Sequence, residues 1–99
     1  MTTETEKPQR PEYISENDDG TVTIGLRSGA KISGAVVKAL QMREPTVADQ
    51  IAVSAMQGGD AAKEVALFAN LCSVTPEEIK SLTMRDYTRV QQGYRCFFD

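Results

Sequence analysis

The sequence predicts an α+β fold in which an N-terminal β-hairpin or small antiparallel sheet packs on about four short α-helices, behind a disordered acidic N-terminal tail. An alternating apolar pattern after Gly20 predicts the strands, and repeated helix-capping signatures after Pro45 predict the helices. The tail follows from the acidic residues that precede Gly20. The 99 residues suffice for one domain with a modest core.

The N-terminal segment differs in charge from the rest of the chain. Residues 1–19 hold six acidic and two basic residues, whereas residues 20–99 hold eight acidic and nine basic residues. With two prolines and few apolar side chains, this segment buries too little surface to offset the entropy lost on ordering. We predict a disordered leader over 1–19 and a folded domain over 20–99. The alternative is a peptide that docks on a partner through Tyr13 and Ile14.

Two strands are expected after the leader. Val22, Ile24 and Leu26 alternate with small or polar residues, which predicts a half-buried strand ending in a turn at residues 28–29. The next segment, residues 30–43, is expected to pair with it, with Gly34 at a bulge or second bend. Val36, Leu40 and Met42 are expected to face one side of this strand, and Val37 and Ala39 the other. A lone hairpin is barely stable in water, so helices must cover its apolar face.

Pro45 ends strand pairing, and Thr46 with Asp49 forms a predicted capping box that begins a helix. Gly58 and Gly59 end this helix. Its apolar residues recur at helical spacing and are expected to pack inward: Val47, Ile51, Ala55 and Met56.

Three more helices are expected downstream. The first begins at Asp60, and the other two begin at capping boxes, residues 75–78 and 83–86. The first presents an apolar face made of Val65, Phe68, Leu71 and Cys72. The last carries a stripe made of Tyr87, Val90, Tyr94 and Phe97, and such stripes usually belong to the core.

Catalytic chemistry finds little support. The chain has no histidine, and its two cysteines lie 24 positions apart, which matches no metal-binding spacing. We therefore predict no enzyme, no cofactor and no metal site, and no segment has the roughly 20 apolar residues of a membrane span. Residues 74–95 resemble a helix-turn-helix displaying Arg85 and Arg89, but the nearly neutral folded part would attract DNA weakly, so nucleic acid is not an expected partner.

Several motifs in fixed order resemble the phage tail assembly chaperone family of contractile-tailed phages. They are the Arg-Glu-Pro-Thr run at residues 43–46 with Asp49, the segment NLCSVTPEE at residues 70–78, and the pair Asp86 and Tyr87. The resemblance covers roughly residues 20–98. It implies a binding protein of the host bacterial cytoplasm that keeps the tape measure protein assembly-competent while tail tube subunits polymerise, and that is absent from the mature virion.

The resemblance implies that a helix of the tape measure protein docks in an apolar groove. Candidate partner-binding residues are Arg43, Glu44, Ile51, Phe68, Tyr94, Phe97 and Phe98. Helical spacing favours the core for Ile51 and Phe68, and the junction favours a structural role for Arg43. Further candidate partners are the tail tube protein, a frameshifted longer form and a second copy of the chain. The alternative functions are a small phage-encoded DNA-binding regulator and a structural tail component.

Overall fold

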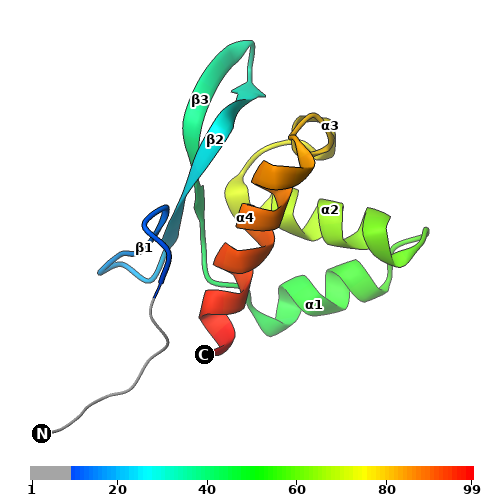
Figure 1. Ribbon diagram of the computed structural model, residues 1–99. Coiled ribbons are helices and arrows are strands. Elements are labelled where there is room, and N and C mark those ends of the chain that lie inside the picture. Colours follow the sequence, from blue (N-terminus) through cyan, green and yellow to red (C-terminus); the bar gives the residue numbers. More distant parts are fainter. Residues whose placement is uncertain (1–9) are drawn as a thin grey trace, which may run out of the picture.

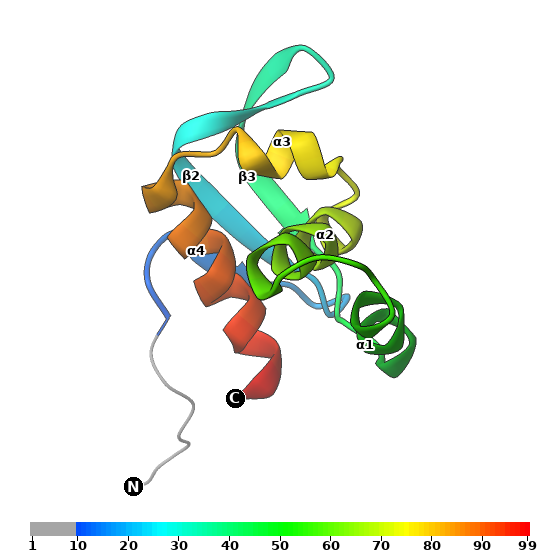
Figure 2. The same ribbon diagram turned by 90° about the vertical axis from the view of Figure 1, so that its right-hand side faces the viewer.

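The computed structural model describes residues 10–99, which form a three-stranded antiparallel sheet with helices packed on one face (Figures 1 and 2). The strands lie in the order β1-β2-β3. The elements are β1 (Ile14–Glu16), β2 (Val22–Ile32), β3 (Ala35–Met42), α1 (Val47–Ser54), α2 (Asp60–Cys72), α3 (Pro76–Lys80), α4 (Met84–Arg95) and the 3-10 turn η1 (Cys96–Phe98). This confirms the predicted α+β fold. Within the described residues, no helix is long and apolar enough to cross a membrane.

The prediction that residues 1–19 form a disordered leader is wrong for residues 10–19, which are ordered and contain β1. β1 pairs with β2 in antiparallel register, with Ile14 opposite Ile24, and Ile14 is buried. The Tyr13 hydroxyl donates to Gln92 Oε1 at 2.6 Å, and its ring lies 4.0 Å from the Arg89 guanidinium. Tyr13 and Ile14 therefore dock on their own fold, because the sheet and α4 offer them a surface that composition alone does not reveal. The first nine residues of the predicted leader lie outside the described residues.

The hairpin turn lies further along the chain than predicted. β2 does not end at residues 28–29 but continues to Ile32, and the chain reverses at Ser33 and Gly34, whose φ angles are 52° and 86°. Between Gly25 and Ala30 the register against β3 shifts, because β2 contains extra residues there. The expected break at residues 28–29 is therefore a bulge within one long strand.

The buried carboxylate of Asp86 explains this bulge. It accepts hydrogen bonds from the backbone N–H groups of Arg27, Ser28 and Gly29 at 2.7, 2.9 and 3.2 Å, and it is fully buried. The capping box predicted over residues 83–86 is therefore only half correct. The Thr83 hydroxyl caps α4 by accepting a hydrogen bond from the Asp86 N–H. The Asp86 carboxylate, however, accepts from the backbone of the bulge and not from the Thr83 N–H, as a capping box requires. Burial raises the pKa of Asp86, but the three N–H donors and Arg89 outweigh it and leave the pKa below its usual value.

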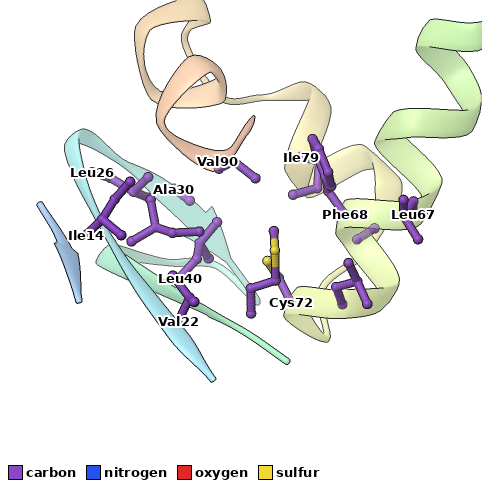
Figure 3. Packing of buried hydrophobic residues seen from close by; sticks show 14 residues of the cluster. Ile14, Val22, Leu26, Ala30, Leu40, Leu67, Phe68, Cys72, Ile79 and Val90 are labelled. Carbon is purple, nitrogen blue, oxygen red and sulfur yellow. The ribbon is translucent and has the colours of Figure 1, made fainter. Parts of the chain in front are cut away.

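The core lies between the sheet and the helices α2, α3 and α4 (Figure 3). Its largest fully buried apolar side chains are Phe68, Ile24, Met42, Leu71 and Val90. Leu40 and Met42 are buried, but Val36, which is expected on the same face, is 64% exposed. It lies in the distal part of the hairpin, which extends past the helices (Figure 1).

Gly93 lets α4 approach the sheet closely. A Cβ atom at this position would lie 2.6 Å from two carbon atoms of Ile24, which is itself fully buried. We expect Gly93→Ala to destabilise the fold by about 1–3 kcal/mol through overpacking. Gly59→Ala is the matched control, because a Cβ there has no neighbour within 4 Å. Chemical unfolding followed by circular dichroism measures both, and equal stabilities would contradict this account of α4 packing.

Asp86→Asn tests the clamp on the bulge. The amide keeps one acceptor oxygen but turns an NH₂ group toward backbone donors, so we expect a loss of about 2–3 kcal/mol in unfolding free energy. Glu77→Gln, at an exposed surface pair with Lys80, should change stability by less than about 0.5 kcal/mol. An Asp86→Asn variant as stable as the control would show that the three hydrogen bonds are dispensable.

Candidate partner-binding surface

The junction between β3 and α1 is organised around a second carboxylate, that of Asp49. Arg43 donates to both of its oxygens, at 2.7 and 2.8 Å, and the Thr46 N–H donates at 2.8 Å, which completes the predicted capping box. The side-chain amide of Asn70 on α2 donates at 3.2 Å. The hydrogen bond from Arg43, followed by that from Thr46, holds the pKa of Asp49 well below its usual value. Asp49 thereby joins β3, α1 and α2.

Asp49 also decides which side of α1 faces outward. It is the buried residue of this helix, whereas Val47 is 77% exposed and Ile51 is 64% exposed. Each of these two lies two positions from Asp49, which places it on the opposite side of an α-helix. The prediction that Val47, Ile51, Ala55 and Met56 pack inward is therefore wrong, because the hydrogen-bond set of Asp49 takes the inward side.

The exposed surface of α1 carries no charge. Asp49 is the single charged residue between Val47 and Gly59, and it is already paired with Arg43. We call the exposed apolar residues of this segment the α1 outer face: Val47, Ala48, Ile51, Ala52, Ala55 and Met56. Sequence reasoning missed Val47 and Met56 as surface residues, although a helix with only one charged side chain has no ordinary polar face to turn toward water.

A hollow of about 380 Å³ lies beside this face, between α1, α2 and the end of α4. Val53, Leu67, Phe68 and Tyr94 form its apolar part. The other lining residues are polar or charged: Gln50, Ser54, Asp60, Lys63 and Glu64. Ile51 lies three positions before Ser54 on the helix, so the α1 outer face and the hollow adjoin. The Tyr94 ring stands between those of Phe68 and Phe98, with centroids 5.2 and 5.0 Å away.

The structure brings part of the predicted site together. Phe68, Tyr94 and Phe98 form one aromatic row that runs from the core to the surface, since Phe68 is 1% exposed and Phe98 is 65% exposed. Phe97 is partly buried against the core. The core position favoured for Phe68 is correct, whereas the one favoured for Ile51 is wrong.

The remaining two predicted residues, Arg43 and Glu44, lie at the junction, and Glu44 lines a hollow together with Phe97. Arg43 binds Asp49, and its backbone N–H donates to the Leu71 carbonyl at 3.0 Å. Glu44 is exposed. Arg43 therefore fixes the position of α1, and through it the direction of the α1 outer face.

The surface offers apolar contact rather than reactive groups. Burial raises the pKa of the Cys72 thiol to about 12, so this thiol stays protonated at neutral pH. Burial and the nearby carboxylate of Glu64 raise the pKa of Tyr87, whose hydroxyl donates to Glu64 at 2.5 Å. In the part of the chain that is described, no cluster of three potential ligands from His, Cys, Asp and Glu could hold a metal ion.

The two arginines of the helix-turn-helix pattern are not equivalent. The first helix of this pattern, α3, has only five residues. Arg85 is exposed, but Arg89 is partly buried, with its guanidinium over the Tyr13 ring and a hydrogen bond of 3.1 Å to the Gly25 carbonyl. Arg89 thus serves the attachment of the N-terminal segment and of β2 to α4.

Comparison with protein families matches residues 23–99 to the family described as "Phage tail assembly chaperone proteins, E, or 41 or 14". The chain belongs to this family. The matched region contains both carboxylate clusters, the α1 outer face and the hollow beside it. No curated protein and no solved structure gives a significant match. The resemblance that residues 43–49, 70–78 and 86–87 indicate is therefore confirmed for this tail assembly chaperone.

The depressed pKa of Asp49 makes the stability of the chaperone sensitive to acid. A carboxyl group titrates near pH 4 in the unfolded chain and lower in the folded one, so its contribution is full above about pH 4 and is lost as the pH falls further. We expect the melting temperature of the wild type to fall more steeply below about pH 4 than that of Asp49→Asn. The control Gln50→Ala changes no titratable group at an exposed position of the same helix and should keep the wild-type slope. Parallel profiles for all three proteins would contradict the role given to Asp49.

Proposed function

We propose that this tail assembly chaperone binds an apolar helix of the tape measure protein on the α1 outer face and in the adjoining hollow, and keeps that protein assembly-competent during tail tube polymerisation. The observation that carries the proposal is the inverted orientation of α1, which exposes Val47 and Ile51 although a fold of this size needs apolar residues for its core. Exposed contiguous apolar surface in a small protein favours a binding role.

The shape of the surface suits a helix in a groove. Successive apolar side chains of a client helix, spaced by three and four residues, could contact Ile51, enter the hollow above Phe68 and reach Phe98. The absence of charge on the α1 outer face means that a client helix can approach without leaving an ion unpaired. Arg43 and Glu44 then act at the junction, where Arg43 holds α1 in the receptive orientation.

The expected affinity is modest, which suits a chaperone that has to release its client. Covering Val47 and Ile51 stabilises a complex by about 3–6 kcal/mol, and association of two proteins costs at least about 4 kcal/mol. Because the gain barely exceeds this cost, contact with these two side chains alone does not give a stable complex. The aromatic row and the hollow must contribute, and a long client that repeats its apolar stripe offers several sites for successive copies.

The proposal places the chaperone in the host bacterial cytoplasm and outside the mature virion, since it handles its client before the tail is complete. The tail tube protein and a frameshifted longer form of the chain are further proposed partners. The exposed position of Phe98 allows a longer form to continue from the chain end beside the hollow.

Co-expression with the tape measure protein of the same phage, followed by size-exclusion chromatography with light scattering, tests the proposal. We expect a soluble complex with the wild-type chaperone. Ile51→Glu should fold normally, because Ile51 is exposed, but should weaken the complex at least about tenfold by placing a charge against the client. Met84→Glu is the matched control, since Met84 is 74% exposed on another helix.

Two results would count against different parts of the proposal. A client that aggregates beside wild-type chaperone would reject the tape measure protein as the partner. A complex that forms equally well with Ile51→Glu would retain the partner but reject the α1 outer face. Formation should change little between low and moderate salt, because the contact is apolar, whereas binding of DNA by the alternative regulator would weaken steeply.

A further inference from the structure

The distal half of the β2–β3 hairpin projects from the body of the protein and is held in place at two points (Figure 1). Asp86 binds the backbone of the bulge at its base. At its tip, Glu78 on α3 accepts from the Ser33 N–H at 2.8 Å, and this bond, after that from Thr75, lowers the pKa of Glu78. An arm fixed in this way loses little conformational entropy when it binds a partner.

The outer edge of β3 is open between this arm and Arg43, where Ala39 pairs with Gly25 and Gln41 with Thr23. β3 is the last strand in the order β1-β2-β3, and among residues 10–99 no further strand pairs with it. The Arg43 N–H points away from β2, because it donates to the Leu71 carbonyl. Backbone groups alternate in direction along a strand, so those of Gln41 and Ala39 also point outward. The end of α2 thus covers the edge at Arg43 and leaves it free beyond.

An apolar hollow of about 420 Å³ lies next to this open edge. Its apolar lining comes from the hairpin, from the end of α2 and from the turn that follows α2: Ile32, Val37, Ala39, Leu40, Leu71, Cys72 and Val74. A strand added to a sheet edge places alternate side chains on the same face. The hollow therefore lies where such side chains would enter.

The charge of the hairpin distinguishes between possible occupants. Residues 22–42 contain Arg27, Lys31 and Lys38 and no acidic residue. Asp86 and Glu78 approach the hairpin, but their oxygens bind its backbone N–H groups. An acidic strand would gain from this charge, whereas β3 of a second copy has Lys38 and no acidic residue, and would add only further positive charge.

We propose that the open edge of β3 binds an extended, acidic segment of a partner protein as a fourth strand, with alternate apolar side chains in the hollow beside it. Backbone hydrogen bonds to Ala39 and Gln41 supply the affinity, and the hollow and Lys38 supply the selectivity. This site is separate from the α1 outer face and does not depend on the function proposed for that face.

Fluorescence anisotropy with the full chain tests the site. The probe is a labelled peptide in which valine alternates with glutamate over the length of β3. We expect it to bind, and we expect two changes in the peptide to weaken binding at least about tenfold: N-methylation of alternate residues, which removes the backbone donors, and lysine in place of glutamate. Neither change alters the protein, so these comparisons do not depend on the folding of a variant.

Two variants locate the site on the protein. Ala39→Pro should abolish binding with an unchanged circular dichroism spectrum, because proline removes an outward N–H that the sheet does not use. Lys38→Glu should weaken binding of the glutamate peptide and improve that of the lysine peptide. Retention of binding by Ala39→Pro would place the peptide elsewhere, such as on the β1 edge.

Other results would also overturn the proposal. They are absence of binding up to about 1 mM peptide, equal binding of the N-methylated probe, and a wild-type dimer in light scattering that Ala39→Pro dissociates. The last result would show that a second copy occupies the edge. If Ala39→Pro does not fold, the comparison of the unmodified and N-methylated peptides decides the question.

Discussion

Three backbone N–H groups of β2 converge on the buried carboxylate of Asp86, and the arrangement of the sheet, the hairpin and α4 depends on this contact. A bulge leaves backbone donors without strand partners, and a buried carboxylate needs donors. The bulge provides the N–H donors that the Asp86 carboxylate needs, and the carboxylate provides the acceptor that these donors need. Together they are stable, although each alone would be unfavourable. Because Asp86 lies in the first turn of α4, the same contact fixes that helix against β2 at the point where the hairpin begins to project.

Asp49 plays a corresponding part at the other side of the core, with a different consequence. A buried carboxylate deprived of its partners costs several kcal/mol, whereas leaving a valine or isoleucine exposed forgoes about 1.5–3 kcal/mol each. Arg43, Thr46 and Asn70 all donate hydrogen bonds to Asp49. The orientation of α1 that buries Asp49 is therefore more stable than the one that buries the apolar side, and the apolar side faces outward. The exposed apolar surface of this chaperone is thus a direct result of a polar cluster.

The two surfaces left open by these clusters suit different kinds of partner segment. The α1 outer face and the hollow near Phe68 match a helix, since they present side chains without free backbone groups. The β3 edge presents backbone groups and matches an extended chain. They belong to different elements, α1 and β3, which are joined through Arg43 and Asp49.

The elements that depend on local chemistry can be predicted from the sequence. Thr46 with Asp49, and Thr75 with Glu78, begin helices because their side chains bind backbone groups only three residues away, and the period-two pattern beginning at Val22 marks a strand. The motifs at residues 43–49 and 70–78 are also sufficient to indicate the family. The side of α1 that faces the core, the partners of Asp86 and the docking of Ile14 on β2 become known only from the three-dimensional fold. Each of these depends on donors, acceptors or apolar surface far away in the chain, as with the N–H groups of Arg27 and Ser28 that Asp86 binds, and no local pattern encodes where such groups will lie.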